Sequence, residues 1–240
     1  MEKLKSGAEK LGIYLNPEQL DKFERYYHEL IDWNKKINLT RITNYEEVQA
    51  KHFLDSLTVT LAIKLDDGGR GLRVIDVGTG AGLPGIPLKI VFPNIHLTLL
   101  EATSKKAKFL KHFVGRLGLD KVEIAIGRAE EIAHDSQYRE KFDVVLSRAV
   151  VSLPALVELM LPFSAVGGCC VAQKKGDIER EVEQSLKAME VMGGRLRGIK
   201  RVELEELNDK RSLVIIDKVK FTPAEYPRRA GMPAKRPILP

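Results

Sequence analysis

The chain has 240 residues, of which 44% are hydrophobic and 30% are charged. This length suits one large α/β domain with an extension, and no apolar run is long enough to span a membrane as a helix. The first ten residues alternate charged and single apolar side chains, which is not the pattern of a secretory signal, so we expect a cytoplasmic protein. The 39 lysines and arginines outnumber the 33 acidic residues, which suits a polyanionic partner without identifying one.

The two cysteines, Cys169 and Cys170, are adjacent in a predicted strand. Neighbouring strand residues point to opposite faces, so the pair cannot form an ordinary disulfide, and its spacing is not that of metal ligands. We therefore expect two small apolar core residues in a reducing compartment, and no metal centre.

Residues 1–66 are expected to form a helical N-terminal extension. Asn16 before Pro17 is typical of a helix start, and apolar side chains then recur at helical spacing. Asn44, followed closely by two glutamates, predicts a second helix start. The glycine-rich residues 66–71 form the clearest linker in the chain.

Strands and helices alternate through residues 67–220, which predicts right-handed crossovers and a mostly parallel sheet. The predicted strands are residues 72–77, 95–100, 122–126, 142–146, 168–173, 196–204 and 212–219. The predicted helices among them are residues 84–91, 103–117 and 177–192.

The last two predicted strands are joined by a short turn at Asn208 and Asp209, so they should pair antiparallel at one edge of the sheet. The sequence therefore predicts a Rossmann-like α/β fold, with a mostly parallel seven-stranded sheet and an antiparallel edge strand. Residues 221–240 are rich in proline and basic residues and should form an extended arm.

An apolar strand runs directly into a glycine-rich turn, and a helix follows. Glycine allows a sharp turn and lets a ligand approach the backbone, and the helix N-terminus beyond it offers free N–H groups. Read literally, Gly80, Gly82 and Gly85 match the dinucleotide-binding fingerprint. In that fingerprint the first glycine lies at the strand exit, which here is Gly78, and counted from it the third glycine would fall on Leu83.

Two acids accompany this turn. Asp76 stands just before it, where a carboxylate facing the ligand disfavours a pyrophosphate and favours the cationic amino-acid end of S-adenosylmethionine. Glu101 ends the second strand, where it can accept hydrogen bonds from both hydroxyls of a ribose. Such an acid also occurs in nicotinamide-dependent enzymes, so Glu101 alone does not decide the cofactor.

Several separate motifs follow one another along the chain. They are Asn38-Leu39-Thr40, His52-Phe53-Leu54-Asp55-Ser56, the run from Asp76 through Gly85 to Leu88, Lys105-Lys106 before Phe109-Leu110, Gly127-Arg128-Ala129-Glu130-Glu131, Ser147-Arg148-Ala149, Lys175-Gly176 and Tyr226-Pro227-Arg228-Arg229-Ala230-Gly231-Met232-Pro233. In these motifs, and over nearly its whole length, the chain resembles the ribosomal RNA small subunit methyltransferase G family, also called glucose-inhibited division protein B.

The resemblance implies a class I methyltransferase that binds S-adenosylmethionine and methylates N7 of a guanine in small-subunit ribosomal RNA. Glu101 would then hold the ribose, Ala129 and Glu130 would border the adenine, and Arg148 would face the cofactor and the incoming base. Some members of the family carry Asp in place of Glu101, and either acid can hold a ribose. The full expected cofactor site is Asp76, Gly78, Thr79, Gly80, Gly82, Leu83, Glu101, Ala102, Ala129, Glu130 and Arg148.

The candidate catalytic residues are Arg148 and Lys175. Guanine N7 has an in-plane lone pair and no proton, so its methylation needs no general base and depends mostly on positioning. The two cations would hold the O6 edge of the base or nearby phosphates. A structural ion pair is the alternative for Arg148. Lys175 fits the lysine of the family better than Lys174, because it directly precedes Gly176.

RNA phosphates are expected to contact Lys105, Lys106 and Lys108, together with Arg228 and Arg229 of the tail. The alternative for the lysines is a solvated helix face, and the alternative for the tail is that it wraps around the domain.

His52 and Asp55 lie one helical turn apart, and are either solvated neighbours or part of the site. The single tryptophan, Trp33, is expected to close a small helical core rather than stack on a base.

Two other functions stay open at this point. One is an NAD(P)-dependent oxidoreductase on the same fold. The other is a non-catalytic ribosome-assembly factor, against which the intact set of Asp76, Gly78, Gly80 and Glu101 argues. We expect a monomer whose partner is small-subunit ribosomal RNA or the assembled 30S particle.

Overall fold

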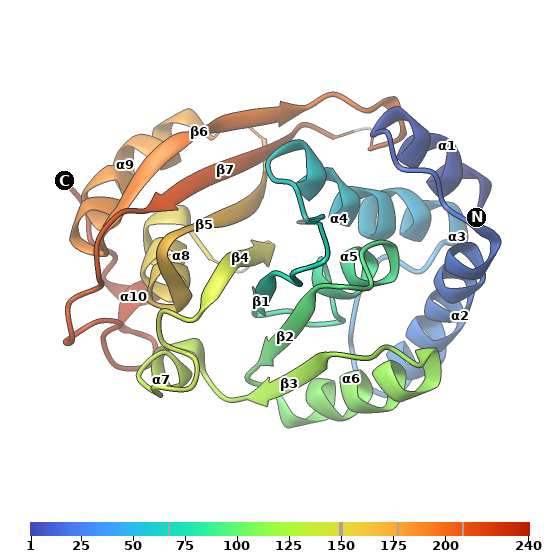
Figure 1. The fold of residues 1–240 in the computed structure, drawn as a ribbon, viewed down its shortest axis with the longest axis horizontal. Coiled ribbons are helices and arrows are strands. Elements are labelled where there is room, and N and C mark those ends of the chain that lie inside the picture. Colours follow the sequence, from blue (N-terminus) through green and yellow to red (C-terminus); the bar gives the residue numbers. More distant parts are fainter. Residues whose placement is uncertain (67, 149–150, 177, 208) are drawn as a thin grey trace.

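The computed structural model describes residues 1–66, 68–148, 151–176, 178–207 and 209–240. Within them a seven-stranded sheet in the order β3-β2-β1-β4-β5-β7-β6 has helices on both faces (Figure 1). Neighbouring strands from β3 to β5 are parallel, and β7 is antiparallel to both β5 and β6. The strands are β1 (Arg73–Val77), β2 (His96–Glu101), β3 (Val122–Ile126), β4 (Phe142–Arg148), β5 (Ser164–Lys175), β6 (Gly194–Val202) and β7 (Arg211–Lys218).

The α-helices are α1 (Glu2–Lys10), α2 (Pro17–Asn34), α3 (Tyr45–Val48), α4 (Asp55–Leu57), α5 (Gly85–Val91), α6 (Ser104–Leu117), α7 (Ala129–Ile132), α8 (Leu153–Met160), α9 (Glu179–Val191) and α10 (Met232–Lys235). A π-helical turn, Gln49–Leu54, joins α3 to α4, and tighter helical turns span Thr58–Leu61, Leu161–Phe163 and Glu205–Leu207. No helix in the described part of the chain has both the length and the apolarity needed to cross a membrane.

Helix starts and ends follow the local sequence. The Asn16 side chain accepts a hydrogen bond from the Gln19 N–H and the Gln19 side chain accepts one from the Asn16 N–H, so α2 begins with a reciprocal cap. Asn44 caps the N–H groups of the two glutamates that follow it. Gly118 ends α6 in the left-handed region, with φ 59°.

Successive strand residues point to opposite faces of the sheet, and two apolar cores result. Val74 and Leu99 belong to the core that packs against α1, α2, α5 and α6, whereas Ile75 belongs to the core under α8 and α9. Cys169 and Cys170 lie in different cores, as the alternation in a strand predicts.

The N-terminal extension contributes a buried aromatic cluster to the first of these cores. Rings from α2 and from the π-helical turn pack at tilted angles: the centroids of Tyr26 and Phe53 are 4.9 Å apart, and those of Phe23 and Phe53 are 5.1 Å apart. Tyr26 also lies 4.4 Å from Phe113 of α6. Trp33 packs on Phe109 of α6 at 5.7 Å, which agrees with its expected role in a helical core.

A buried carboxylate joins the same extension to the carboxyl ends of the strands. Asp55 accepts a hydrogen bond from Arg148 Nη1 at the end of β4 (3.0 Å) and one from Arg211 Nε at the start of β7 (2.9 Å). Gln173 of β5 donates to the backbone carbonyl of Asp55 (2.7 Å). Three strands are thereby linked to one turn of the extension, which fixes the position of residues 1–66 on the sheet.

Residues 221–240 fold back onto the domain instead of forming the extended arm that their composition predicts. Arg228 forms an ion pair with Glu158 of α8, which has no exposed surface, and α10 packs beside α8. The proline content excludes a long helix, but it does not prevent the backbone from bonding to neighbouring side chains, and this is why composition alone misleads here.

Predicted and observed elements agree closely within the sheet. The antiparallel pair β6 and β7 lies at one end of it, with β7 on the inner side. The sequence does not predict the helix α8, because it is short and Glu158 is its one polar side chain, which gives no clear polar face. Four predicted positions lie outside the described residues: Asp67 of the linker, Ala149 of the motif after the fourth strand, Asp177 at the expected helix start, and Asn208 of the expected turn.

Replacing Asp55 should reveal how much the extension depends on this carboxylate. We expect Asp55→Ala to lower the free energy of unfolding by about 3–5 kcal/mol, because the buried Arg211 and the half-buried Arg148 both lose this carboxylate. Asp32→Ala is the control: its side chain is 69% exposed and pairs only with Lys35, so the denaturation midpoint should not move. Equal midpoints for both variants in chemical denaturation would show that the buried cluster does not hold the extension in place.

Candidate functional site

The expected site residues converge at the carboxyl ends of β1, β2 and β4, which are adjacent in the sheet. The glycine-rich turn leaves β1 there, and its Gly78 and Thr79 N–H groups donate to the Leu100 carbonyl of β2 (2.9 and 3.1 Å). In open α/β sheets, ligands bind at this end of the strands where the connections diverge.

The turn needs glycine at three positions. Gly78, Gly80 and Gly82 have φ of 71°, 61° and 94°, in the region that side chains other than glycine rarely adopt. A Cβ at position 82 would also lie 2.4 Å from Ile86 and 2.9 Å from the Tyr26 hydroxyl. By contrast, the space beside Gly80 is nearly open, because the nearest heavy atom lies 4.0 Å from where a Cβ would be. The backbone therefore presents an approachable surface at Gly80.

Asp76 lies beneath the turn and is fully buried, whereas the sequence predicts a carboxylate that faces the ligand. Its Oδ2 accepts hydrogen bonds from the Thr79 hydroxyl (2.6 Å) and from the Gly85 N–H at the start of α5 (2.9 Å). Its Oδ1 has no hydrogen-bond partner among the described residues. Burial raises the pKa of Asp76 to about 6, against hydrogen bonds from Thr79 and Gly85 that lower it.

Glu101 closes the opposite side of the turn. Its Oε2 accepts a hydrogen bond from the Gly80 N–H (3.0 Å), and its Oε1 accepts one from the Thr103 N–H (2.8 Å). Each carboxylate oxygen retains a second lone pair, so both can accept a ribose hydroxyl without losing these bonds. Ala102 beside it is exposed.

Ala129 and Glu130 begin α7, directly after β3, and both are half-buried. Ile126 at the end of β3 is 45% exposed, which provides an apolar surface at the same edge. The arrangement fits S-adenosylmethionine: a buried carboxylate with a free oxygen lies under the turn, a second carboxylate lies at its rim, and apolar surface lies beyond. Such a donor set suits a cation, a ribose and a purine in that order.

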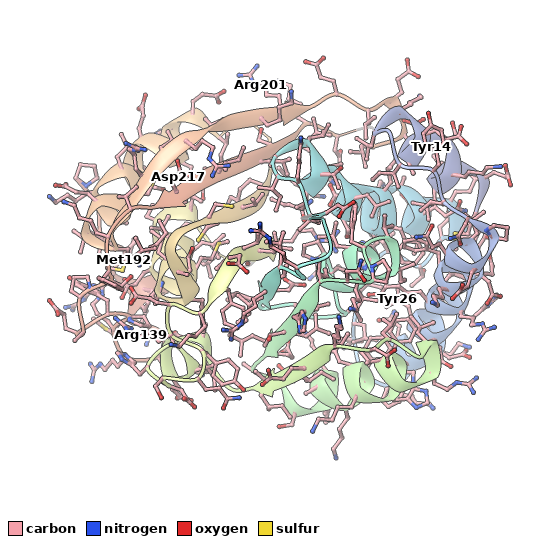
Figure 2. All side chains as sticks on the ribbon, viewed as in Figure 1. Tyr14, Tyr26, Arg139, Met192, Arg201 and Asp217 are labelled. Carbon is pink, nitrogen blue, oxygen red and sulfur yellow. The ribbon has the colours of Figure 1, made fainter. Side chains whose placement is uncertain are left out.

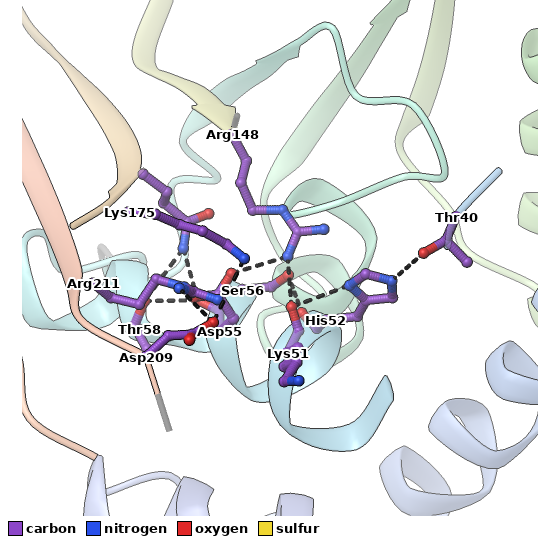
Figure 3. Close-up of polar contacts among 11 residues, drawn as sticks. Thr40, Lys51, His52, Asp55, Ser56, Thr58, Arg148, Lys175, Asp209 and Arg211 are labelled. Carbon is purple, nitrogen blue, oxygen red and sulfur yellow. Dashed lines mark hydrogen bonds and ion pairs between the residues drawn. The ribbon is translucent and has the colours of Figure 1, made fainter. Parts of the chain in front are cut away.

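Arg148 reaches from the end of β4 toward the extension (Figure 3). One terminal nitrogen, Nη1, donates to Asp55 Oδ2 (3.0 Å) and to the Lys51 carbonyl (3.2 Å). The other guanidinium nitrogens bond to none of the residues that the structure describes. Arg148 thus forms a structural ion pair, which is the alternative considered for it, and still has N–H donors that a ligand can use. Ala149 of the same motif lies outside the described ranges.

His52 and Asp55 are buried parts of this cluster rather than solvated neighbours. The His52 Nε2 lies 2.7 Å from the Thr40 hydroxyl, and its Nδ1 lies 3.1 Å from the Lys51 carbonyl. Burial, with the nearby charges of Arg148 and Lys175, lowers the pKa of His52 to about 3, so the imidazole is neutral near pH 7.

Lys175 lies at the edge of the same cluster and is 62% exposed. Its Nζ is 3.6 Å from Asp209 Oδ2. The preceding Lys174 is instead buried against the Glu181 carboxylate, which it contacts at 3.0 Å. Lys175 is therefore the lysine that solvent and a large ligand can reach, as its place before the glycine suggested.

The expected RNA contacts separate into two groups. Lys105, Lys108 and Arg229 are exposed, and Lys106 is half-exposed, on the segments that follow β2 and in the tail. Arg228 has a structural role instead: its Nε and Nη2 both bind the buried Glu158. Glu158 therefore holds two of its guanidinium nitrogens, a constraint that the spacing of charges in the sequence could not show.

Two residues of the extension and the last strands complete the site without having been predicted. Tyr26 donates a hydrogen bond to the Ala81 carbonyl (2.6 Å) and so fixes the glycine turn from below (Figure 2 labels Tyr26). Arg211 supplies the second cation to Asp55. Neither Tyr26 nor Arg211 lies in a sequence motif, so only the fold shows that they belong to the site.

A mostly parallel sheet of this order, with a glycine turn between the buried Asp76 and the Glu101 carboxylate, defines the chain as a Rossmann-like class I methyltransferase. The family model of rRNA small subunit methyltransferase G matches residues 19–214. The chain belongs to this family.

Relatives in the family match the chain from end to end. Ribosomal RNA small subunit methyltransferase G of Dehalococcoides mccartyi is 53% identical over 240 residues, 100% of both chains. The protein of the same name from Pelotomaculum thermopropionicum is 46% identical over 237 residues, which are 99% of this chain and 98% of that one.

Solved structures of more distant proteins share the fold. A mutant of MtNAS in complex with S-adenosylmethionine has a TM-score of 0.54 at 17% identity, covering 90% of this chain and 77% of its own. TYW2 of M. jannaschii in complex with AdoMet has a TM-score of 0.52 at 15% identity, covering 69% of this chain and 77% of its own. At these identities the likeness establishes the fold alone.

The raised pKa of Asp76 predicts an unusual pH dependence of stability. Its folded-state pKa of about 6 exceeds the ordinary value of 3.8, so the folded state binds more protons and stability falls as pH rises from about 4 to about 6. The loss should be roughly 3 kcal/mol. Comparing the unfolding free energies of the protein and Asp76→Asn across this range isolates the contribution, and a difference that stays constant with pH would contradict it.

Removing one hydroxyl should test the role of Tyr26. Tyr26→Phe keeps the buried ring but loses the bond to Ala81, so we expect binding of S-adenosylhomocysteine to weaken roughly fivefold, with a stability loss of about 1 kcal/mol. Tyr27→Phe, on the same helix, loses only an exposed 3.3 Å bond to Thr43 and should bind normally. Calorimetric affinities that are equal for the two variants would show that the turn does not depend on Tyr26.

Proposed function

We propose that this chain transfers the methyl group of S-adenosylmethionine to N7 of a guanine in small-subunit (16S) ribosomal RNA. The observation that carries the proposal is the intact glycine turn between Asp76 and Glu101 in a chain of the rRNA methyltransferase G family. Membership of that family favours methyl transfer over the nicotinamide-dependent reaction, and the complete site argues against an assembly factor without activity.

The roles of the residues follow from their positions. S-adenosylmethionine supplies an electrophilic methyl group when it is bound. Glu101 holds the ribose hydroxyls, Gly80 lies against the cofactor, and Ala129 and Glu130 border the adenine. The negative charge of Asp76 beneath the turn attracts the cationic amino-acid end, because a buried charge acts through a medium of low dielectric constant.

Arg148 is the residue best placed to meet the base. Its free guanidinium nitrogens lie at the exit of β4, and Asp55 and the Lys51 carbonyl fix their direction. Arginine commonly binds guanine through its O6 and N7 edge, and here a contact to O6 would leave N7 open to the methyl group. Lys175, exposed beside it, is placed to bind a neighbouring phosphate.

The cluster around Arg148 suits a reaction in which no proton leaves the base. His52, the nearest imidazole to the arginine, has its pKa lowered to about 3, which makes it a weak proton acceptor. Its hydrogen bond to Thr40 further occupies Nε2. Because N7 attacks with a lone pair that carries no proton, positioning and exclusion of water are sufficient contributions from these residues.

In this proposal, the exposed basic residues bind ribosomal RNA. Lys105, Lys108 and Arg229 are exposed and can bind phosphates around the target nucleotide. The acceptor is the RNA alone or the assembled 30S particle, and the enzyme acts as a monomer in the cytoplasm.

Product analysis tests the proposed reaction. Ribosomal RNA incubated with the protein and labelled S-adenosylmethionine should yield N7-methylguanosine, with kcat flat above about pH 7 because no general base titrates in the chemical step. Gly80→Val, which fills the space beside the turn, should abolish both cofactor binding and product. A product methylated at an exocyclic amine, or kcat that rises steeply with an essential lysine or histidine, would refute methylation at N7.

A further inference from the structure

The helix that carries the expected adenine contacts is only partly anchored by its own side chains, because Ala129 and Ile132 pack at the margin of the core under α8 and α9. The helix α7 has only four residues, and none of Ala129, Glu130, Glu131 and Ile132 is buried. A helix this short gains little from its own hydrogen bonds, so its position must depend on contacts from elsewhere. Two such contacts come from the C-terminal tail, 93 and 101 residues further along the chain.

Two hydrogen bonds join the tail directly to α7 and the turn that follows it. The Gly231 N–H donates to Glu130 Oε1 (2.8 Å), and His134 Nε2 lies 2.9 Å from the Pro227 carbonyl. Gly231 has φ 80° and precedes α10, so glycine is required for its N–H to point toward Glu130. A bond to a carboxylate is stronger than one between neutral groups, and it fixes the Glu130 side chain at the edge of the cofactor site.

Arg139 fastens the same two segments together. Its Nη1 donates to the Ala133 carbonyl after α7 (3.1 Å) and to the Tyr226 carbonyl of the tail (2.9 Å). Its Nη2 donates to the Thr222 and Pro223 carbonyls (2.8 and 3.0 Å). The planar guanidinium therefore sets the distance between α7 and the tail (Figure 2 labels Arg139 beside α7).

The tail is itself held firmly enough to act as a support. The Arg228 backbone N–H and side chain bind both oxygens of Glu158, which is fully buried in α8. Arg228 Nη2 also donates to the Arg236 carbonyl, which closes the tail over α10. A buried carboxylate paired in this way is costly to expose, so the segment between Tyr226 and Gly231 keeps a fixed path.

We propose that residues 226–231 form a positioning strap that holds α7, and with it Ala129 and Glu130, against the adenosine half of the cofactor. The inference rests on the proposed function, because it takes the adenine to lie at α7. It gives the Tyr226-Pro227-Arg228-Arg229-Ala230-Gly231 motif a role in cofactor binding, in addition to the phosphate contact proposed for the exposed Arg229. Its residues contact no reacting atom and act through Glu130.

The sharpest test shortens the tail beyond its anchor. Removing residues 230–240 keeps the Arg228–Glu158 pair but deletes the N–H that Glu130 accepts. We expect the affinity for S-adenosylhomocysteine to fall roughly tenfold, the scale of one hydrogen bond to a charged group. The affinity for 5′-methylthioadenosine should fall by the same factor, because both ligands share the adenosine half. Removing only residues 239–240 is the matched control, because Leu239 is exposed and neither bond is lost.

Three further measurements separate the strap from the other roles of a tail. Hydrogen exchange of the ligand-free shortened protein should speed up at residues 128–134 and stay unchanged in β1 and β2. The KM for the methyl donor should rise while kcat and the KM for RNA stay the same. Arg139→Lys, which retains the charge but not the planar donor pair, should reproduce these effects in the full-length chain.

The outcomes are distinct for each alternative. Unchanged cofactor affinity with a raised KM for RNA and a weaker salt dependence would show an RNA-binding arm and overturn the strap. General loss of exchange protection throughout the sheet in both the shortened protein and Arg139→Lys would show a merely structural role and overturn it as well. If the intact protein itself fails to bind S-adenosylhomocysteine, the proposed function fails first.

Discussion

The carboxylate of Asp55 accepts hydrogen bonds from Arg148 and Arg211, which come from the ends of two different strands. An isolated charge at this depth would be strongly destabilising, and two arginines with one carboxylate satisfy each other only in a single arrangement. The pairing therefore fixes where the extension lies on the sheet. It also fixes the direction of Arg148, whose remaining nitrogens bond to none of the described residues. Stability and the orientation of the candidate catalytic cation thus depend on the same buried group.

The site is assembled from segments that the sequence places far apart. Tyr26 supports the turn from the extension, the strand ends supply Asp76, Glu101 and Arg148, and the tail reaches Glu130 through Gly231. The division into residues 1–66, 67–220 and 221–240 remains a useful description of the sequence. In the folded chain, however, the first apolar core mixes side chains of the extension with those of the sheet, so the extension is part of the same packed unit.

Much of this could be predicted, for identifiable reasons. Short apolar runs located the strands, and Asn16 and Asn44 marked helix starts because capping is local chemistry. The glycine turn and Glu101 were visible because a ligand-binding backbone needs specific residue types at specific places. The resemblance to a family then supplied the acceptor, which no pattern in the chain identifies alone.

The remainder depended on tertiary contacts. Burial of Asp76 beneath the turn, the pairing of Arg228 with Glu158, and the bond from Tyr26 to Ala81 join residues separated by many positions, and their side-chain types are compatible with other roles. The path of the tail depends on such contacts too: its prolines and charges predict an extended arm that either binds RNA or wraps around the domain, and its backbone groups contact Arg139, His134 and Glu130. The composition of a segment can exclude a secondary structure, but it does not predict the tertiary contacts of that segment.

In the proposed complex, the turn between Asp76 and Glu101 holds the methyl donor, and the reactive end of the donor faces Arg148. A crystal structure of the protein with S-adenosylhomocysteine would test this arrangement. We expect ribose hydroxyls within about 3 Å of the Glu101 carboxylate, adenine beside Ala129, and the sulfur on the side of Arg148. A ligand bound elsewhere, or one whose ribose makes no hydrogen bond to Glu101, would contradict it.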